Sequence, residues 1–99
     1  MKVLKSLGKV SPEVARQQVE AGAKLIDVRS PGEFSSGHLP GAQNIPLGEL
    51  AARLGSIGDK EKPVVIYCLS GGRSGSAKGI LARGGFTQVF DLGAMSRWR

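Results

Sequence analysis

The amino-acid sequence predicts an α/β fold, with helices flanking a small parallel sheet of about four or five short strands. Short apolar runs alternate along the chain with segments of helical spacing, which is the pattern of right-handed crossovers between parallel strands. The clearest strand covers residues 63–67, where Val64, Val65 and Ile66 stand between a charged stretch and a glycine-rich one. Glycine supplies 15 of the 99 residues, which indicates many turns and close backbone approaches.

The chain begins with a weak strand and a well-marked helix. Residues 3–10 are interpreted as the weak strand and its lead-in. Ser11 and Pro12 mark a helix start, because a hydroxyl side chain caps the free amides and proline suits the first helical position. Gly22 is expected to end this helix.

The remaining elements follow from two patterns, apolar runs for strands and a three-to-four-residue apolar spacing for helices. They are expected at residues 25–28 (strand), 33–36 (helical turn), 42–45 (strand), 47–54 (helix), 63–67 (strand), 74–83 (helix) and 87–90 (strand). No repeat or linker interrupts the series, so residues 1–99 are expected to form a single domain.

Composition narrows the functional classes. Fourteen basic and 8 acidic residues give a net charge of +6, which favours anionic partners. One cysteine makes an internal disulfide impossible, and one cysteine with one histidine falls short of a structural zinc site. We therefore expect no metal and no cofactor. Nucleic-acid binding is not expected either, since no surface motif of interleaved aromatic and basic residues accompanies the charge.

The chain carries no sign of a membrane segment. No stretch approaches the roughly 18 apolar residues that a spanning helix needs. Lysines interrupt the apolar residues near Met1, so the continuous run of about 7–15 apolar residues of a secretory signal is missing. We expect a cytoplasmic protein that binds no membrane. A periplasmic location stays open if Met1 replaces a removed signal.

The most informative segment surrounds Cys68, which follows the clearest strand. Open α/β sheets bind ligands at the carboxyl ends of their strands. Gly71 and Gly72 allow the backbone to curl so that several amides point inward, and the helix that follows adds its own free amides and positive dipole end. Arg73 adds a fixed positive charge. Such surroundings stabilise a thiolate, the nucleophilic form of cysteine.

Two other interpretations fit this segment less well. A lone cysteine after a buried strand is often only a small apolar residue, but the glycines, Arg73 and the following helix favour chemistry at Cys68. A nucleotide-binding loop is disfavoured, because the chain has neither a Gly-Lys-Ser/Thr sequence nor a GxGxxG pattern opening the helix.

Residues 68–74 resemble the active-site loop of single-domain rhodaneses, the thiosulfate sulfurtransferases, which follow C-x-x-G-x-R-S/A. Residues 27–46 are similar to that family's pattern D-V-R-x-x-x-E-F-x-x-G-H-I-x-G-A-x-N-I-P at nearly every fixed position. The resemblance extends from Ser11 to the end and implies a rhodanese-like fold. It weakens where Gly93 and Ala94 stand in place of the Gly-Gly that family members often carry, which leaves the final helix open.

The resemblance implies that the chain moves sulfane sulfur from thiosulfate to a thiophilic acceptor, cyanide or a thiol, through a persulfide on Cys68. Asp27 and Arg29 match charged family positions and are expected to support the site, whereas His38 is expected to be structural. The residues expected to bind the donor are those of the loop: Leu69, Ser70, Gly71, Gly72, Arg73 and Ser74.

Related activities remain as alternatives. Phosphatases and arsenate reductases of the same fold carry five residues between cysteine and arginine, whereas this chain has four, Leu69 to Gly72. Enzymes that use 3-mercaptopyruvate usually carry an uncharged loop, so Arg73 favours thiosulfate. A sulfur-relay protein, which would pass persulfide between proteins with slow thiosulfate turnover, would use the same Cys68 chemistry and stays open.

Overall fold

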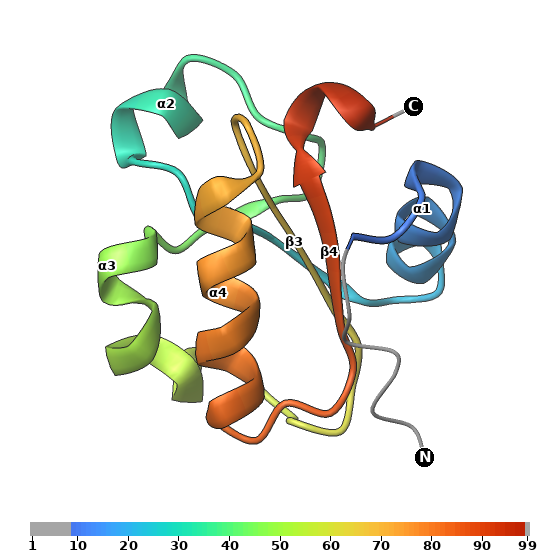
Figure 1. The fold of residues 1–99 in the computed structure, drawn as a ribbon, viewed down its shortest axis with the longest axis vertical. Helices are drawn as coiled ribbons and strands as arrows, with labels where there is room; N and C mark the ends of the chain where they lie inside the picture. The colour runs from blue at the N-terminus through green and yellow to red at the C-terminus, as the bar shows by residue number, and fades with distance from the viewer. Residues whose placement is uncertain (1–8, 99) are drawn as a thin grey trace.

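The computed structural model describes residues 9–98, and Figure 1 shows its layers. Helices and strands alternate along the chain. The order is α1 (Pro12–Glu20), β1 (Lys24–Asp27), α2 (Pro31–Ser35), β2 (Gln43–Asn44), α3 (Leu47–Leu50), the 3-10 helix η2 (Ala51–Ser56), β3 (Val64–Cys68), α4 (Gly72–Arg83), β4 (Val89–Ala94) and the 3-10 helix η3 (Met95–Arg97).

The described strands form one parallel sheet in the order β2-β1-β3-β4. β3 is central and fully buried, which explains why its sequence is a continuous apolar run rather than an alternating one. The pairing of β3 with β4 shifts register between Ile66 and Tyr67, so that Cys68 pairs with Ala94. The predicted fold class is confirmed, with four strands in residues 9–98.

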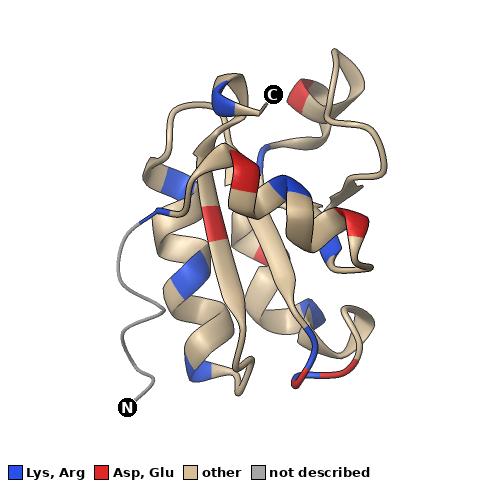
Figure 2. Cartoon of the chain, turned by 90° about the vertical axis from the view of Figure 1, so that its right-hand side faces the viewer, with Lys and Arg blue, Asp and Glu red and all other residues tan. Residues whose placement is uncertain are grey.

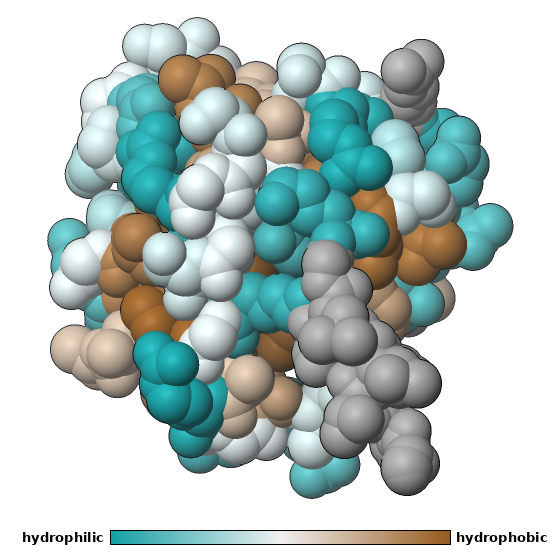
Figure 3. Space-filling model, in the orientation of Figure 1, coloured by the Kyte–Doolittle hydropathy of each residue, from teal (hydrophilic) through white to brown (hydrophobic). Residues whose placement is uncertain are grey.

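Apolar side chains alternate between the two faces of the sheet and build two cores. On one face Ile66 packs beneath α3 and α4 against Leu50 and Leu81. On the other, Val65 and Tyr67 lie beneath α1. Figure 3 shows apolar surface over the α3 and α4 face, where Leu47, Leu54 and Ile80 are only partly buried.

The first helix follows the predicted start and stop signals. Ser11 caps α1 by accepting a hydrogen bond from the amide of Val14, and the chain turns at Gly22, which has a φ of 107°. The weak strand expected at residues 3–10 falls mostly on residues 3–8, which lie outside the described residues. The prediction is wrong for residues 9 and 10, which form no strand, although Val10 donates its amide to the carbonyl of Asp91.

Several predicted boundaries shift for local reasons. The helical turn expected at residues 33–36 begins at Pro31, because Ser30 and Glu33 form a reciprocal capping box. The helix expected at residues 47–54 is divided into α3 and η2, with a backbone kink at Arg53. α4 begins at Gly72 rather than at residue 74, and β4 continues to residue 94 rather than ending at 90.

The sheet brings the carboxyl ends of β1, β3 and β4 to one edge, so Asp27, Cys68 and Ala94 end neighbouring strands. Open parallel sheets bind ligands at this edge. Across residues 9–98, none of the helices is long and apolar enough to cross a membrane.

Candidate active site

Cys68 ends the central strand, and its sulfur is enclosed by the loop that follows. The amide of Gly71 donates to Cys68 Sγ at 2.9 Å, and the amide of Ser74 donates to the same atom at 3.3 Å. The residue is 1% exposed. Two amides directed at one sulfur stabilise negative charge on it.

The loop keeps this shape through one glycine and one hydroxyl. Gly71 has a φ of 110°, a conformation that L side chains rarely adopt, and it stands at the N-cap of α4. The Ser74 hydroxyl donates to the carbonyl of Gly71 at 3.1 Å and closes the turn. Ser74 is buried, whereas Leu69 is 56% exposed at the other end of the loop.

Arg73 leaves this loop and forms a two-pronged ion pair with Glu33 of α2. Its Nη1 and Nη2 donate to the two carboxylate oxygens at 2.7 and 3.0 Å. The hydrogen bond from Arg73 is the main reason why the pKa of Glu33 falls from 4.5 to about 2, and the same bond raises the pKa of Arg73. Because Glu33 also caps α2, the pair connects that helix to the Cys68 loop.

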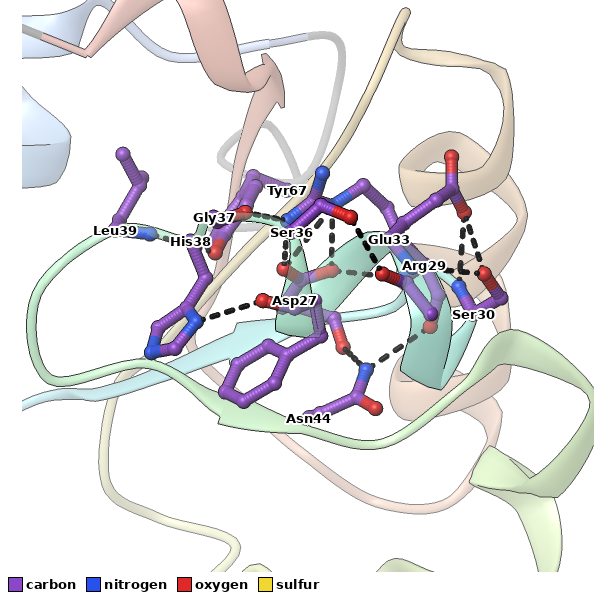
Figure 4. Close-up of polar contacts among 12 residues, drawn as sticks. Asp27, Arg29, Ser30, Glu33, Ser36, Gly37, His38, Leu39, Asn44 and Tyr67 are labelled. Carbon is purple, nitrogen blue, oxygen red and sulfur yellow. Dashed lines mark hydrogen bonds and ion pairs between the residues drawn. The ribbon is translucent and has the colours of Figure 1, made fainter.

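A second ion pair, between Asp27 and Arg29, is buried beside β1 (Figure 4). Arg29 donates through its backbone amide, Nε and Nη2 to the Asp27 carboxylate, at 2.6 to 3.0 Å. Arg29 Nη2 also donates to the carbonyl of Gly37, and the side-chain amide of Asn44 donates to the backbone carbonyls of Asp27 and Arg29. The network therefore joins β1 to the α2–β2 connection and to β2.

Tyr67 links this network to the strand that carries Cys68. Its ring lies 5.8 Å from the Arg29 guanidinium carbon, and its hydroxyl accepts the amide of Leu39 at 3.1 Å. Burial is the main cause that raises the pKa of Tyr67 to about 12. The side-chain hydrogen bonds of Asp27 and Arg29 given for residues 9–98 do not include the Cys68 loop, so their supporting role stays a prediction.

His38 is exposed and contacts Phe34. Its ring stacks on Phe34 with centroids 3.7 Å apart, and Nδ1 lies 2.9 Å from the carbonyl of Phe34 (Figure 4). This arrangement fits the structural role expected for it. Across residues 9–98, no group of three His, Cys, Asp or Glu side chains is placed to hold a metal ion.

The expected donor-binding residues are contiguous in the loop, but the structure adds a partner that the sequence did not assign. The sequence predicts Glu33 only as the first residue of a helical turn and as part of the family pattern, and it gives no pairing with Arg73. The negative charge of Glu33 was the available signal, but a sequence separation of 40 gives no indication of contact.

The comparisons with known proteins agree with this architecture. Residues 11–99 match the family model of the rhodanese-like domain. The chain is 39% identical over 94 residues to the uncharacterized Bacillus subtilis protein YqhL, covering 91% of this chain and 74% of that protein. It is 35% identical to the thiosulfate sulfurtransferase GlpE of Pseudomonas aeruginosa strain LESB58, covering 92% and 83%.

A solved structure gives the same result at the level of the fold. The human single-domain sulfurtransferase TSTD1 superposes with a TM-score of 0.78 at 31% identity, covering 91% of this chain and 93% of that one. Because the family model spans residues 11–99, and because two relatives exceed 30% identity over at least 74% of their length, the chain belongs to the rhodanese-like domain family.

Proposed function

We propose that this protein is a sulfurtransferase that takes the outer sulfur of thiosulfate onto Cys68 and passes it to a thiophilic acceptor. The observation that carries the proposal is the pair of amides, from Gly71 and Ser74, directed at a single cysteine sulfur. A structural cysteine does not need two charge-stabilising donors, whereas a nucleophile that alternates between thiolate and persulfide does.

The proposed reaction has two steps. The Cys68 thiolate attacks the outer sulfur of thiosulfate, a new S–S bond forms, and the S–S bond of thiosulfate breaks with its electron pair leaving on sulfite. Cyanide or a thiolate then attacks the outer sulfur of the persulfide, and the electron pair of that bond returns to Cys68. No external oxidant or reductant is needed. In each step a sulfur atom passes from one nucleophile to another, and the departing nucleophile keeps the electron pair of the broken bond.

The loop residues have separate roles in this proposal. The Gly71 and Ser74 amides stabilise the charge on sulfur, while Leu69, Ser70 and Gly72 shape the opening. The Arg73 side chain is 38% exposed, and its positive charge stabilises the departing oxyanion. Its hydrogen bonds to Glu33 fix its orientation, so part of its donor capacity is already used.

A persulfide relay between proteins is the second candidate, and Leu69 is the observation that favours it. This side chain is the one large hydrophobic residue that is exposed in residues 9–98, and it directly follows Cys68. An exposed apolar side chain beside the nucleophile suits contact with a partner protein. Persulfide chemistry at Cys68 would be the same, so kinetics rather than geometry separates the two candidates.

Steady-state kinetics tests the proposal. Thiosulfate should give thiocyanate with cyanide. With a thiol it should give that thiol's persulfide, from which a second thiol releases sulfide and forms a disulfide. Both reactions should be far faster than aryl phosphate hydrolysis. Rapid turnover with small acceptors supports the enzyme, whereas persulfide formation with slow release to every small acceptor favours the relay. Faster aryl phosphate hydrolysis than sulfur transfer would contradict both and point to a phosphatase.

A further inference from the structure

A lysine outside both family motifs lies against the Cys68 loop. Lys9 is exposed, and the backbone hydrogen bond from Val10 to the carbonyl of Asp91 holds this part of the chain along β4. A Cβ built on Gly71 would stand 3.1 Å from Lys9 Cε and 3.6 Å from Nζ. Since Gly71 donates its amide to Cys68 Sγ, the Lys9 ammonium lies beside the cradle of the nucleophile.

A second glycine makes room for the same side chain. A Cβ on Gly93 would come within 2.6 Å of Lys9 Cε and 2.7 Å of Cδ, so any other residue there would displace the lysine. Gly93 pairs with Tyr67 in the sheet, immediately before the pairing of Cys68 with Ala94. The Lys9 side chain therefore lies across the carboxyl edge of β3 and β4, where ligands of parallel sheets bind.

Arg97 places a second cation at this position. Its Nη1 lies 3.5 Å from the same Gly93 Cβ position, and it donates to the carbonyl of Leu92. Figure 2 shows basic positions where the described chain begins, along α4 and beside the C-terminus. Two like charges held this close repel each other unless an anion lies near them.

No carboxylate neutralises these cations in the part of the chain that the structure describes. Within residues 9–98, the ion pairs of Arg29, Arg53 and Arg73 with carboxylates involve neither Lys9 nor Arg97. The carboxylates nearest in sequence are Glu13 for Lys9, which is exposed on α1, and Asp91 for Arg97, which is buried in β4, and neither forms an ion pair with these cations. By contrast, Arg73 already shares both of its prongs with Glu33. Lys9 and Arg97 therefore add positive charge at this end of the sheet to that of Arg73, part of whose donor capacity is used by Glu33.

We propose that Lys9, assisted by Arg97, binds the sulfonate oxygens of thiosulfate while its outer sulfur meets Cys68. The inference rests on the proposed sulfur transfer and names a donor-binding residue that neither motif contains. Thiosulfate is a dianion approaching a thiolate, so an unpaired cation at the entrance lowers the repulsion between them and holds the donor in line. When the S–S bond of thiosulfate breaks, the same cations hold the sulfite that leaves.

A packing role for Lys9 must be separated from a charge role. Lys9→Met retains the aliphatic chain over Gly71 and Gly93 but removes the ammonium, and Lys9→Arg retains the charge. Lys62→Met is the matched control, because Lys62 is exposed next to the amino end of β3, opposite Cys68, and its loss changes the net charge by the same amount. Because the Lys9 side chain is exposed, both Lys9 variants are expected to fold.

The test measures the two half-reactions separately. The second-order rate of persulfide formation from thiosulfate is followed by intact mass, and removal of the sulfur by dithiothreitol, a neutral thiol, is followed from the loaded protein. We expect Lys9→Met to load about three- to tenfold more slowly, as loss of a partly solvated ionic contact implies. Unloading should be unchanged, and Lys9→Arg and Lys62→Met should load at about the wild-type rate.

Donor charge and salt sharpen the result. With methanethiosulfonate, a monoanion, the loading defect of Lys9→Met should be smaller than with thiosulfate, and high salt should reduce it for both donors. Equal loading of Lys9→Met and Lys62→Met would overturn the inference, as would a defect equally large for both donors. Wild-type protein that takes up no sulfur from either donor would instead overturn the proposed function itself.

Discussion

Two arginine–carboxylate pairs lie near the carboxyl ends of β1 and β3, and they differ in sequence separation and in burial. Arg29 and Asp27 are two residues apart, with side chains that are 5% and 0% exposed. Arg73 and Glu33 are 40 residues apart, with side chains that are 38% and 30% exposed. The Asp27–Arg29 pair lies within one short segment at the end of β1, whereas the Glu33–Arg73 pair joins α2 to α4 at the surface.

This difference in burial indicates which arginine can bind an incoming ligand. A buried pair cannot exchange partners without leaving a charge uncompensated in the interior, so it serves as a fixed support. A partly exposed pair loses little when it opens, because water solvates both groups. Arg73 is therefore able to share its donors with an incoming oxyanion, while Arg29 is committed to Asp27, Gly37 and the ring of Tyr67.

The largest expected effect comes from breaking the buried pair. Asp27→Asn should lower the free energy of unfolding by about 3–5 kcal/mol, because Arg29 would keep its charge without a counter-ion in the interior. Urea unfolding followed by circular dichroism measures this loss. Glu33→Gln serves as the comparison, since it breaks the surface pair and should cost far less. Similar unfolding midpoints for the two variants would contradict the distinction between the pairs.

Arg73 should matter for the donor rather than for the fold. Arg73→Ala should reduce kcat/KM for thiosulfate about thirtyfold, which corresponds to roughly 2 kcal/mol for a charge-assisted contact. Arg73→Lys should recover only part of this, because a point charge does not reproduce the planar fork. The thiocyanate assay provides the rates. If Arg73→Ala retained the wild-type kcat/KM but unfolded more easily, Arg73 would be only a structural link to Glu33.

Tyr67 tests how closely the buried network supports the strand. Tyr67→Phe leaves the amide of Leu39 without its acceptor and should cost about 1–2 kcal/mol of unfolding free energy. The pKa of Tyr67 is raised from 10.0 to about 12, so its neutral form stabilises the fold below pH 10 and this contribution is lost as the pH rises towards 12.

The pH dependence of unfolding at alkaline pH separates ionisation of Tyr67 from the loss of its hydrogen bond. Stability curves of wild type should fall more steeply between pH 10 and 12 than those of Tyr67→Phe, which has no phenol to ionise. Parallel curves over this interval would mean that burial does not oppose ionisation of Tyr67.

The smallest expected effect is the acid dependence of the surface pair. The pKa of Glu33 is lowered from 4.5 to about 2, so its contribution is present above pH 4.5 and is lost as the pH falls towards 2. Glu33→Gln should therefore unfold with a slightly shallower pH dependence than wild type between pH 4.5 and 2. The measurement is urea unfolding at a series of pH values in low salt, with Glu49→Gln, from the exposed Arg53–Glu49 pair, as the matched surface control.

The sequence predicts most of the fold because its signals are local. Ser11 and Pro12 start α1 as expected, and the apolar run at residues 64–66 lies in the buried central strand. The start of α4 was placed two residues late, because the positive φ of Gly71, which brings the following residues into the helix, cannot be inferred from a glycine-rich segment alone. The sequence predicts a strand end at residue 90, before the charged Asp91, whereas β4 continues to Ala94 because Asp91, Gly93 and Ala94 stay paired with β3.

The part of the candidate site that lies in one continuous segment, residues 68–74, can be predicted from the sequence. Cys68, Gly71 and Ser74 are close in sequence, so their meeting around one sulfur could be expected from loop and helix geometry. The contacts of Glu33 with Arg73, and of Lys9 with Gly71, depend on how distant segments pack on the sheet. No periodicity or motif encodes such pairs in a single sequence, and only the folded chain brings them together.

The central claim is that Cys68 carries a transferable sulfur, and intact mass measures this directly. Protein incubated with thiosulfate and freed of small molecules should gain the mass of one sulfur atom and lose it on treatment with cyanide, with thiocyanate appearing in equal amount. Cys68→Ser should gain nothing under the same conditions. A wild-type protein that gains no sulfur, or a Cys68→Ser protein that forms thiocyanate at the wild-type rate, would contradict the account.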